Sequence, residues 1–351
     1  MQTELRPRGD YPGAHHHVTN RGLAGRTVFE GRPDVRYFLA QLAWAVHERW
    51  LEVHAYSILT THFHLLLTST RGELSDALMR IEYRYVKRFN RLRDRDGSLF
   101  RSRFRSRLVD SDEYWLNVIR YIDANAVEAG LCATPGEHEF GSAQYYLTGR
   151  RNPWLERAQV ERTVRRCCRA GEFRAEDYER VFGAGLDPEE RWVLERRLEQ
   201  GSPNDGGRGS GDELLRAAPE HVRRWLGSCT ELADGGRTGL VLAAPARVRR
   251  VVGEAAGSDP DPVQDRRSLS CWPTIEAGLL RQLCGLTLQE ISEAAGISRS
   301  GAWQRLVRHS QRLALDPGYG RRVEQVLQRM GGAAAAVGER PWRAGLFSEK
   351  P

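Results

Sequence analysis

Apolar and polar residues follow two different patterns along the first 150 residues, and each pattern predicts one kind of element. Four short runs have the composition of strands: residues 14–21, 53–59, 62–68 and 104–109. Three longer runs place apolar residues at helical spacing: residues 34–50, 74–93 and 110–131. Their order along the chain predicts an α+β fold, in which an antiparallel sheet carries helices on one face in a ferredoxin-like arrangement.

The rest of the chain is predicted to be mainly helical, with one long interruption. Residues 148–200 are charged and helical in pattern, and we expect them to form a helical spacer. Residues 201–264 begin with a Gly- and Ser-rich stretch and show no clear period, which indicates a linker and an unassigned region. Residues 265–330 are expected to form an all-α DNA-binding domain, and residues 331–351 a disordered tail.

The segment 287–308 has the pattern of a helix-turn-helix. Gly296 would supply the turn, Ile297 would fill the core and Ser298 would cap the second helix. The exposed side of that helix then offers groups that suit phosphates and guanine edges: Arg299, Ser300, Gln304, Arg305 and Arg308. The segment resembles the DNA-binding domain of the replication initiator DnaA, which implies binding to duplex DNA. A small helical bundle with a basic surface is the alternative.

Two histidines in the third predicted strand carry candidate chemistry. His62 and His64 are one residue apart, so on a strand they point to the same face, while Phe63 points to the other face and into a core. Two imidazoles side by side can hold a divalent metal at an open site. The same pattern also fits two polar residues on the solvated face of a half-buried strand.

A tyrosine and an amide in the last predicted helix extend this hypothesis. Tyr121 and Asn125 are four residues apart, so they share one helical face. Ser111 is suited to cap this helix at its start, and Gly130 to end it. Beside the two histidines, these residues would make a metal-dependent phosphoryl-transfer site. The alternative for Tyr121 is an ordinary half-buried helix tyrosine.

Four motifs, in this order, resemble the REP-associated tyrosine transposases, a branch of the single-tyrosine HUH transposases. The motifs are His17-Val18-Thr19-Asn20-Arg21-Gly22, His62-Phe63-His64, Gly97-Ser98-Leu99-Phe100-Arg101-Ser102-Arg103-Phe104-Arg105-Ser106, and Tyr121-Ile122-Asp123-Ala124-Asn125. They define an expected transposase domain over residues 10–147. The chain departs from the family pattern at Thr61, where the family often has Asn, and at Ala126 and Glu128, where it often has Pro and a basic residue.

The resemblance implies an enzyme that cleaves and rejoins DNA. Tyr121 would be the nucleophile, and one divalent ion, Mg or Mn, would be held by His62, His64 and Asn125. The substrate would be single-stranded DNA beside a hairpin formed by a palindromic repeat, and the intermediate a 5′-phosphotyrosine link. The enzyme would act as a monomer or a homodimer. We expect DNA contacts from basic residues of this domain: Arg21, Arg84, Lys87, Arg88, Arg101, Arg103 and Arg105.

Composition adds a weaker argument in the same direction. Lys and Arg together number 53 against 46 Asp and Glu, giving a formal net charge of +7, which favours a polyanion as partner. The arginine bias of a GC-rich genome is a competing explanation. The cysteines include no Cys-x-x-Cys pair, and neither a signal peptide nor a membrane span is expected, which favours a reduced cytoplasmic setting. The resemblance implies that this setting is bacterial and nucleoid-associated.

Two other functions are compatible with parts of the sequence. The first is a non-catalytic, sequence-specific DNA-binding regulator derived from a transposase. It would use only the helix-turn-helix, and the intact set of His62, His64, Tyr121 and Asn125 argues against it. The second is a nucleotide hydrolase of the histidine-triad type. That site would need a third histidine in register, and Leu66 occupies the position.

Overall fold

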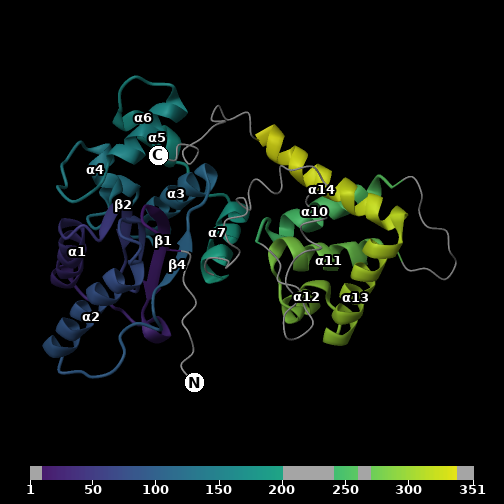
Figure 1. Ribbon diagram of the computed structural model, residues 1–351, viewed down its shortest axis with the longest axis horizontal. Helices are drawn as coiled ribbons and strands as arrows, with labels where there is room; N and C mark the ends of the chain where they lie inside the picture. The colour runs from purple at the N-terminus through teal and green to yellow at the C-terminus, as the bar shows by residue number, and fades with distance from the viewer. Residues whose placement is uncertain (1–9, 201–240, 260–269, 338–351) are drawn as a thin grey trace. The chain divides into compact units, whose positions relative to one another are not determined.

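The computed structural model describes residues 10–200, 241–259 and 270–337 of the 351 (Figure 1). The described residues form two compact units, which are treated separately here. The first holds residues 10–187 and 194–200, and the second holds residues 188–193, 241–259 and 270–337. The Gly- and Ser-rich stretch expected as a linker lies outside the described residues.

A four-stranded antiparallel sheet organises the first unit. Its strands are β1 (Ala14–Arg21), β2 (Leu51–Ile58), β3 (His62–Ser69) and β4 (Arg105–Leu108), in the spatial order β2-β3-β1-β4. In the register of β1 with its two neighbours, Thr19 lies opposite both His64 and Arg105. Directly opposed residues share a face of the sheet. One face therefore collects the histidines of β3 and alternate residues of β1 and β4.

Two helices cover the other face of the sheet. They are α1 (Arg32–His47) and α2 (Leu74–Leu92). The ring of Phe38 in α1 lies 4.8 Å from that of Phe63 in β3, and Tyr85 of α2 contacts Phe38 at 5.5 Å. Phe63 thus points into an apolar core, as the alternation along the strand predicts.

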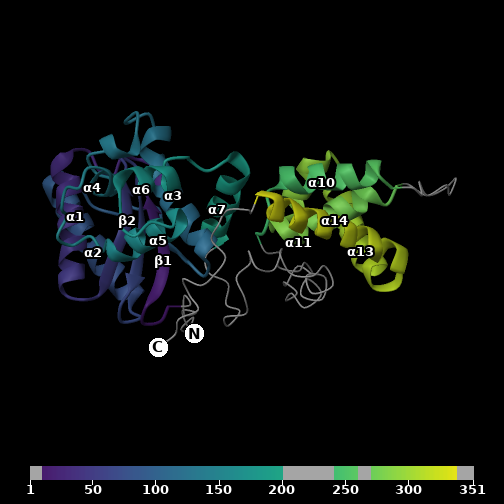
Figure 2. The same cartoon turned by 90° about the horizontal axis from the view of Figure 1, so that it is seen from above.

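The helix that carries Tyr121 lies on the opposite side of the sheet from α1 and α2 (Figure 2). This helix, α3 (Asp112–Glu128), is capped by Ser111, whose hydroxyl accepts a hydrogen bond from the backbone N–H of Tyr114 at 3.1 Å, as predicted. The prediction of helices on one face is therefore correct for α1 and α2 and wrong for α3. The physical reason is that β3 is buried from Phe63 to Ser69 on both of its faces, so its second face also needs a cover.

Short helices complete the first unit. They are α4 (Ala143–Leu147), α5 (Ala158–Cys168) and α6 (Ala175–Phe182), followed by α7 (Pro188–Gln200), which is divided between the units. Tyr178 of α6 donates a 2.7 Å hydrogen bond to Asp123 of α3 and stacks on Tyr146 of α4 at 4.8 Å. The segment expected as a spacer, residues 148–200, therefore packs in large part against the helix that bears Tyr121.

The second unit is all-helical. It contains α10 (Pro245–Gly257), α11 (Trp272–Cys284), α12 (Leu288–Ala295), α13 (Arg299–Leu315) and α14 (Pro317–Val337). Gly296 adopts a left-handed conformation with φ 60° at the end of α12, and the Ser298 hydroxyl accepts from the N–H of Gly301 at 3.0 Å. Both local predictions for this turn are confirmed. The tail expected from residue 331 begins inside α14, and α10 occupies part of the region left unassigned.

Among the described helices, none has the length and apolar content of a bilayer span.

Candidate active site

One strand and one helix bring the predicted chemical groups together in the first unit. The rings of His62 and His64 on β3 have centroids 5.2 Å apart, and the ring of His64 lies 5.0 Å from that of Tyr121 on α3. Asn125, one turn further along α3, is hydrogen-bonded to His62. The structure thus joins all four residues that the sequence singled out as nucleophile and metal ligands. They are largely buried: His64 is 4%, Tyr121 6% and Asn125 8% exposed.

Neighbouring groups fix which atom each histidine can offer to an ion. Nδ1 of His62 lies 2.9 Å from the hydroxyl of Thr61, and Nδ1 of His64 lies 3.3 Å from Nε2 of His17. His64 therefore has its Nε2 left for another partner, whereas His62 also hydrogen-bonds Asn125. Thr61, which stands where the family often has Asn, orients the first histidine.

The amide of Asn125 is held in a similar way. Its Nδ2 donates a 2.5 Å hydrogen bond to the carbonyl of Tyr121, which leaves Oδ1 for the hydrogen bond with His62. Two imidazole nitrogens and one amide oxygen make a donor set that a divalent cation accepts. Among the described residues, no cluster of three or more His, Cys, Asp and Glu side chains is suited to a metal. A cation at this site would therefore need further oxygen ligands from water or from a phosphate.

Burial keeps the histidines of the site neutral near pH 7. Burial lowers the pKa of His17 to about 3, and burial together with the neighbouring rings of His17 and His62 lowers the pKa of His64 well below its usual value. Burial is also the main cause that lowers the pKa of His62, against the raising effect of the hydrogen bond with Asn125. A neutral imidazole has the lone pair that a metal ligand requires. The electrostatics therefore suit cation binding better than proton storage.

The hydroxyl of Tyr121 faces an acidic residue of α7. It donates a 3.4 Å hydrogen bond to Oε1 of Glu195. Leu194 and Leu198 of the same helix are buried, and Arg197 lies over the ring of Tyr114 at 5.6 Å, so this part of α7 packs against α3. The tyrosine is consequently covered by a helix from outside the domain expected at residues 10–147.

Part of the predicted DNA-contact set lies on the same face as the tyrosine. Arg21 is opposite His62 across β1 and β3, and its backbone carbonyl accepts from the N–H of Arg101 at 2.9 Å. Arg105 lies opposite Thr19, and Arg103 is exposed in the segment that leads into β4. Arg21 and Arg105 therefore lie on the face of the sheet that carries the histidines, and the backbone of Arg101 joins the end of β1 beside them.

The remaining predicted contacts of this unit lie on α2, which covers the other face of the sheet. Arg84 stacks on Trp44 at 3.9 Å, and Arg88 stacks on Tyr37 at 4.6 Å and pairs with Asp34 at 3.5 Å. Lys87 is exposed. The structure therefore does not bring Arg84, Lys87 and Arg88 to Tyr121, and any nucleic acid bound there would occupy a separate surface.

On α13 of the second unit, the predicted contact residues form an accessible surface. Arg299, Ser300, Gln304 and Arg308 are exposed, and Arg305 is partly buried. Trp303, which the sequence analysis did not single out, is 40% exposed in the same helix.

Two residues of the candidate site were missed from the sequence. His17 belongs to a quoted motif but received no role, although its position on β1 opposite β3 could have indicated one. Glu195 lies in the segment expected as a spacer, and nothing in the local pattern connects it with Tyr121. Only the packing of α7 shows this contact.

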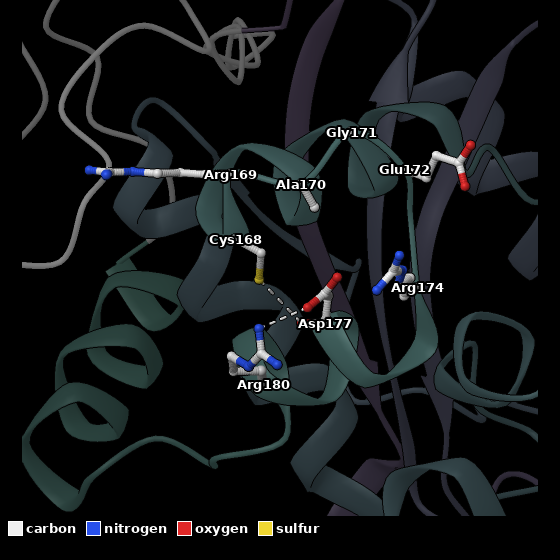
Figure 3. A pocket seen from close by; sticks show the side chains of 8 residues that line it. All are labelled: Cys168, Arg169, Ala170, Gly171, Glu172, Arg174, Asp177 and Arg180. Atoms are coloured by element: carbon white, nitrogen blue, oxygen red, sulfur yellow. Dashed lines mark hydrogen bonds and ion pairs between the residues drawn. The ribbon is translucent and has the colours of Figure 1, made fainter.

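An open hollow of about 470 Å³ lies elsewhere, at the turn between α5 and α6 (Figure 3). Arg180 pairs with Asp177 there at 2.9 Å, and the Cys168 thiol faces the backbone carbonyl of Asp177 at 3.9 Å. None of the predicted site residues lines it. The candidate active site is instead a packed polar layer between the sheet and α3.

Comparison with known proteins gives one structural likeness. No family model matches the chain, and no curated protein matches it. A solved structure described as a REP-associated tyrosine transposase bound to a REP hairpin matches over 45% of this chain and 98% of its own. The identity is 16% and the TM-score 0.35. A likeness at this level carries no argument about activity, so the function has to be argued from the residues.

Proposed function

We propose that this protein is a metal-dependent DNA nuclease and strand transferase of the transposase type. It acts on single-stranded DNA beside a hairpin and forms a covalent 5′-phosphotyrosine intermediate through Tyr121. The order of strands and helices in the first unit supports a ferredoxin-like fold of the kind expected for this class. The observation that carries the proposal is the convergence of Tyr121, His62, His64 and Asn125, which come from two separate segments of the chain.

The residues divide the chemistry between them. The phenolic oxygen of Tyr121 attacks the scissile phosphorus, and the bond from phosphorus to the 3′ oxygen of the departing strand breaks. The phenolic proton passes to Glu195, the acceptor that the hydroxyl already faces, and the 3′ oxygen takes a proton from water to leave as a hydroxyl. The phosphotyrosine bond conserves the energy of the broken bond, so the strand can be rejoined without ATP.

The histidines and the amide would hold the cation that this chemistry requires. His62 and His64 would offer their Nε2 atoms and Asn125 its Oδ1 atom, and the hydrogen bond between His62 and Asn125 would be given up. When bound, a Mg or Mn ion supplies Lewis-acid polarisation of the phosphate. Arg21 and Arg101 at the edge of the site supply positive charge for the backbone of the incoming strand.

The test is covalent capture of DNA by the full chain. A single-stranded oligonucleotide with a hairpin is labelled at its 3′ end, so that the label stays on the fragment whose 5′ phosphate joins Tyr121. It is incubated with the protein and Mn²⁺, and a denaturing gel resolves the adduct. Tyr121→Phe should abolish the adduct and leave hairpin binding intact, because only the nucleophilic oxygen is lost. Tyr114→Phe, which removes a second buried phenol two turns earlier on α3, should leave the adduct in place.

Two outcomes would contradict the proposal. An adduct formed by Tyr121→Phe would place the nucleophile elsewhere. Absence of any adduct with the wild-type chain, together with retained DNA binding, would favour a non-catalytic DNA-binding regulator.

We also propose that the second unit binds duplex DNA through α13. The short helix α12, the turn at Gly296 and the following helix α13 support a helix-turn-helix, and Arg299 and Arg308 are exposed on the second helix. In the full chain, Arg299→Ala with Arg308→Ala should weaken duplex binding and reduce its salt dependence. The same pair should leave formation of the tyrosine adduct on a supplied single strand unchanged.

A further inference from the structure

His17 is the most deeply buried polar group beside the candidate metal ligands. It is 0% exposed on β1, its Nε2 lies 3.3 Å from Nδ1 of His64, and its ring centroid is 5.8 Å from that of Tyr121. Its own Nδ1 is buried and has no hydrogen-bond partner within the described part of the chain. A polar ring placed this way needs an explanation, since buried polar atoms are normally paired.

Only one proton fits between Nε2 of His17 and Nδ1 of His64, so one of the two nitrogens donates and the other accepts. If that proton is on Nδ1 of His64, then Nε2 of His17 accepts it and Nε2 of His64 presents a bare lone pair. If the proton is instead on Nε2 of His17, then Nδ1 of His64 accepts it and the proton of His64 has to sit on Nε2. In the second arrangement His64 cannot bind a cation through Nε2.

We propose that His17 is a positioning residue of the metal site: its Nε2 accepts the Nδ1 proton of His64 and so directs the Nε2 lone pair of His64 toward a divalent ion. This inference rests on the proposed function, because it takes His64 as a ligand. Partners of this kind fix the tautomer and the orientation of a ligating histidine.

The unpartnered Nδ1 of His17 affects which tautomer the His17–His64 pair adopts when no ion is bound. When Nε2 of His17 accepts, its own proton must lie on Nδ1, which is buried without an acceptor among the described residues. That arrangement is unfavourable without the ion, because an unpaired buried N–H is costly. Binding of the cation therefore selects the tautomer that the metal-free protein disfavours.

His15 provides a matched control on the same strand and face. It lies two residues before His17, and its Nδ1 is 2.8 Å from the hydroxyl of Thr68. It is also a half-buried ring against α3, with its centroid 5.1 Å from Trp115. A substitution there disturbs the packing of β1 against α3 without touching His64.

The first experiment measures Mn²⁺ binding to the full chain by titration calorimetry, without DNA. His17→Phe keeps a ring but removes the acceptor, and it should weaken binding by roughly 10–100-fold. His17→Gln, whose side-chain oxygen can accept from Nδ1 of His64, should restore most of the affinity. His15→Phe should bind as the wild type does. Equal affinity of His17→Phe and the wild type would overturn the inference.

The second experiment separates this inference from the proposed function. If the wild type binds no Mn²⁺, the metal site of the proposed function fails, and the histidine pair is then judged by ¹⁵N NMR of the metal-free protein. A scalar coupling across the hydrogen bond between Nε2 of His17 and Nδ1 of His64 is expected in the wild type and in His15→Phe. Its absence from the wild type would overturn the pairing itself.

Discussion

The buried His54 and the half-buried His15, next to the site, allow a quantitative prediction about acid stability. Burial lowers the pKa of His54 to about 3, with a further lowering from His15, and burial with the charge of His16 lowers the pKa of His15 to about 4. Both rings hydrogen-bond the hydroxyl of Thr68, at 2.7 and 2.8 Å. They are therefore neutral in the native state at pH values where an unfolded histidine is already charged.

The sign and size of the effect follow from these values. Since the native pKa is depressed, the stabilisation is fully present above about pH 6.5, the unfolded value, and is lost as the pH falls toward the native pKa values. At pH 5.0 the native rings of His15 and His54 are still neutral, so the loss is governed by protonation of the unfolded chain. Each ring then contributes about 2 kcal/mol less stability at pH 5.0 than at pH 7.5.

The perturbation that isolates one ring is His54→Gln. Glutamine can still reach Thr68 but does not titrate. The variant should therefore lose about 2 kcal/mol less of its free energy of unfolding between pH 7.5 and 5.0 than the wild type loses. Urea unfolding of the full chain, followed by circular dichroism at both pH values, measures the difference. His47→Gln, at a side chain 86% exposed, is the control and should lose as much as the wild type. An unchanged loss in His54→Gln would refute the reasoning.

Three further predictions concern the site and the second unit. Glu195→Gln should slow formation of the Tyr121 adduct in single-turnover gels, because an amide is a weaker proton acceptor than a carboxylate. The control Glu199→Gln, four residues later on α7, should form the adduct at the wild-type rate. Chelation of divalent ions with EDTA should abolish cleavage while an electrophoretic shift still reports hairpin binding. Gly278→Ala should lower the melting temperature of the chain by calorimetry, since a Cβ there would lie 2.2 Å from the ring of His309, and such overpacking costs about 1–3 kcal/mol.

Local patterns predicted most of the fold of the first unit. Alternation along β3 placed Phe63 in the core and the two histidines together, and the cap at Ser111 set the start of α3. These features depend on neighbours in sequence, so the sequence contains the information. The face of the sheet on which α3 packs depends instead on which face α1 and α2 leave uncovered. This is set by tertiary packing and not by neighbours in the sequence.

The contribution of α7 shows where sequence analysis ends. Charged residues at helical spacing predicted a helix, and the helix is present, but its partner could not be inferred. Leu194 and Leu198 are ordinary apolar positions in the sequence, and only their burial against the first unit brings Glu195 to the hydroxyl of Tyr121. Long-range contacts of this kind have no local signal.

Helices cover both faces of the sheet, but most of the buried histidines in its strands lie on the face toward α3. Between the sheet and α1, the contacts are between rings such as Phe63 and Phe38. Between the sheet and α3, apolar residues such as Trp115 are joined by histidines held neutral by burial. These histidines are hydrogen-bonded to one another or to hydroxyl groups, as in the contacts of His17 with His64 and of His54 with Thr68. An apolar layer would stabilise this interface more, because each buried polar group gives up hydration for a single hydrogen bond. The proposed metal site would account for a polar layer at this position, and the predicted acid sensitivity of the fold involves histidines of the same layer.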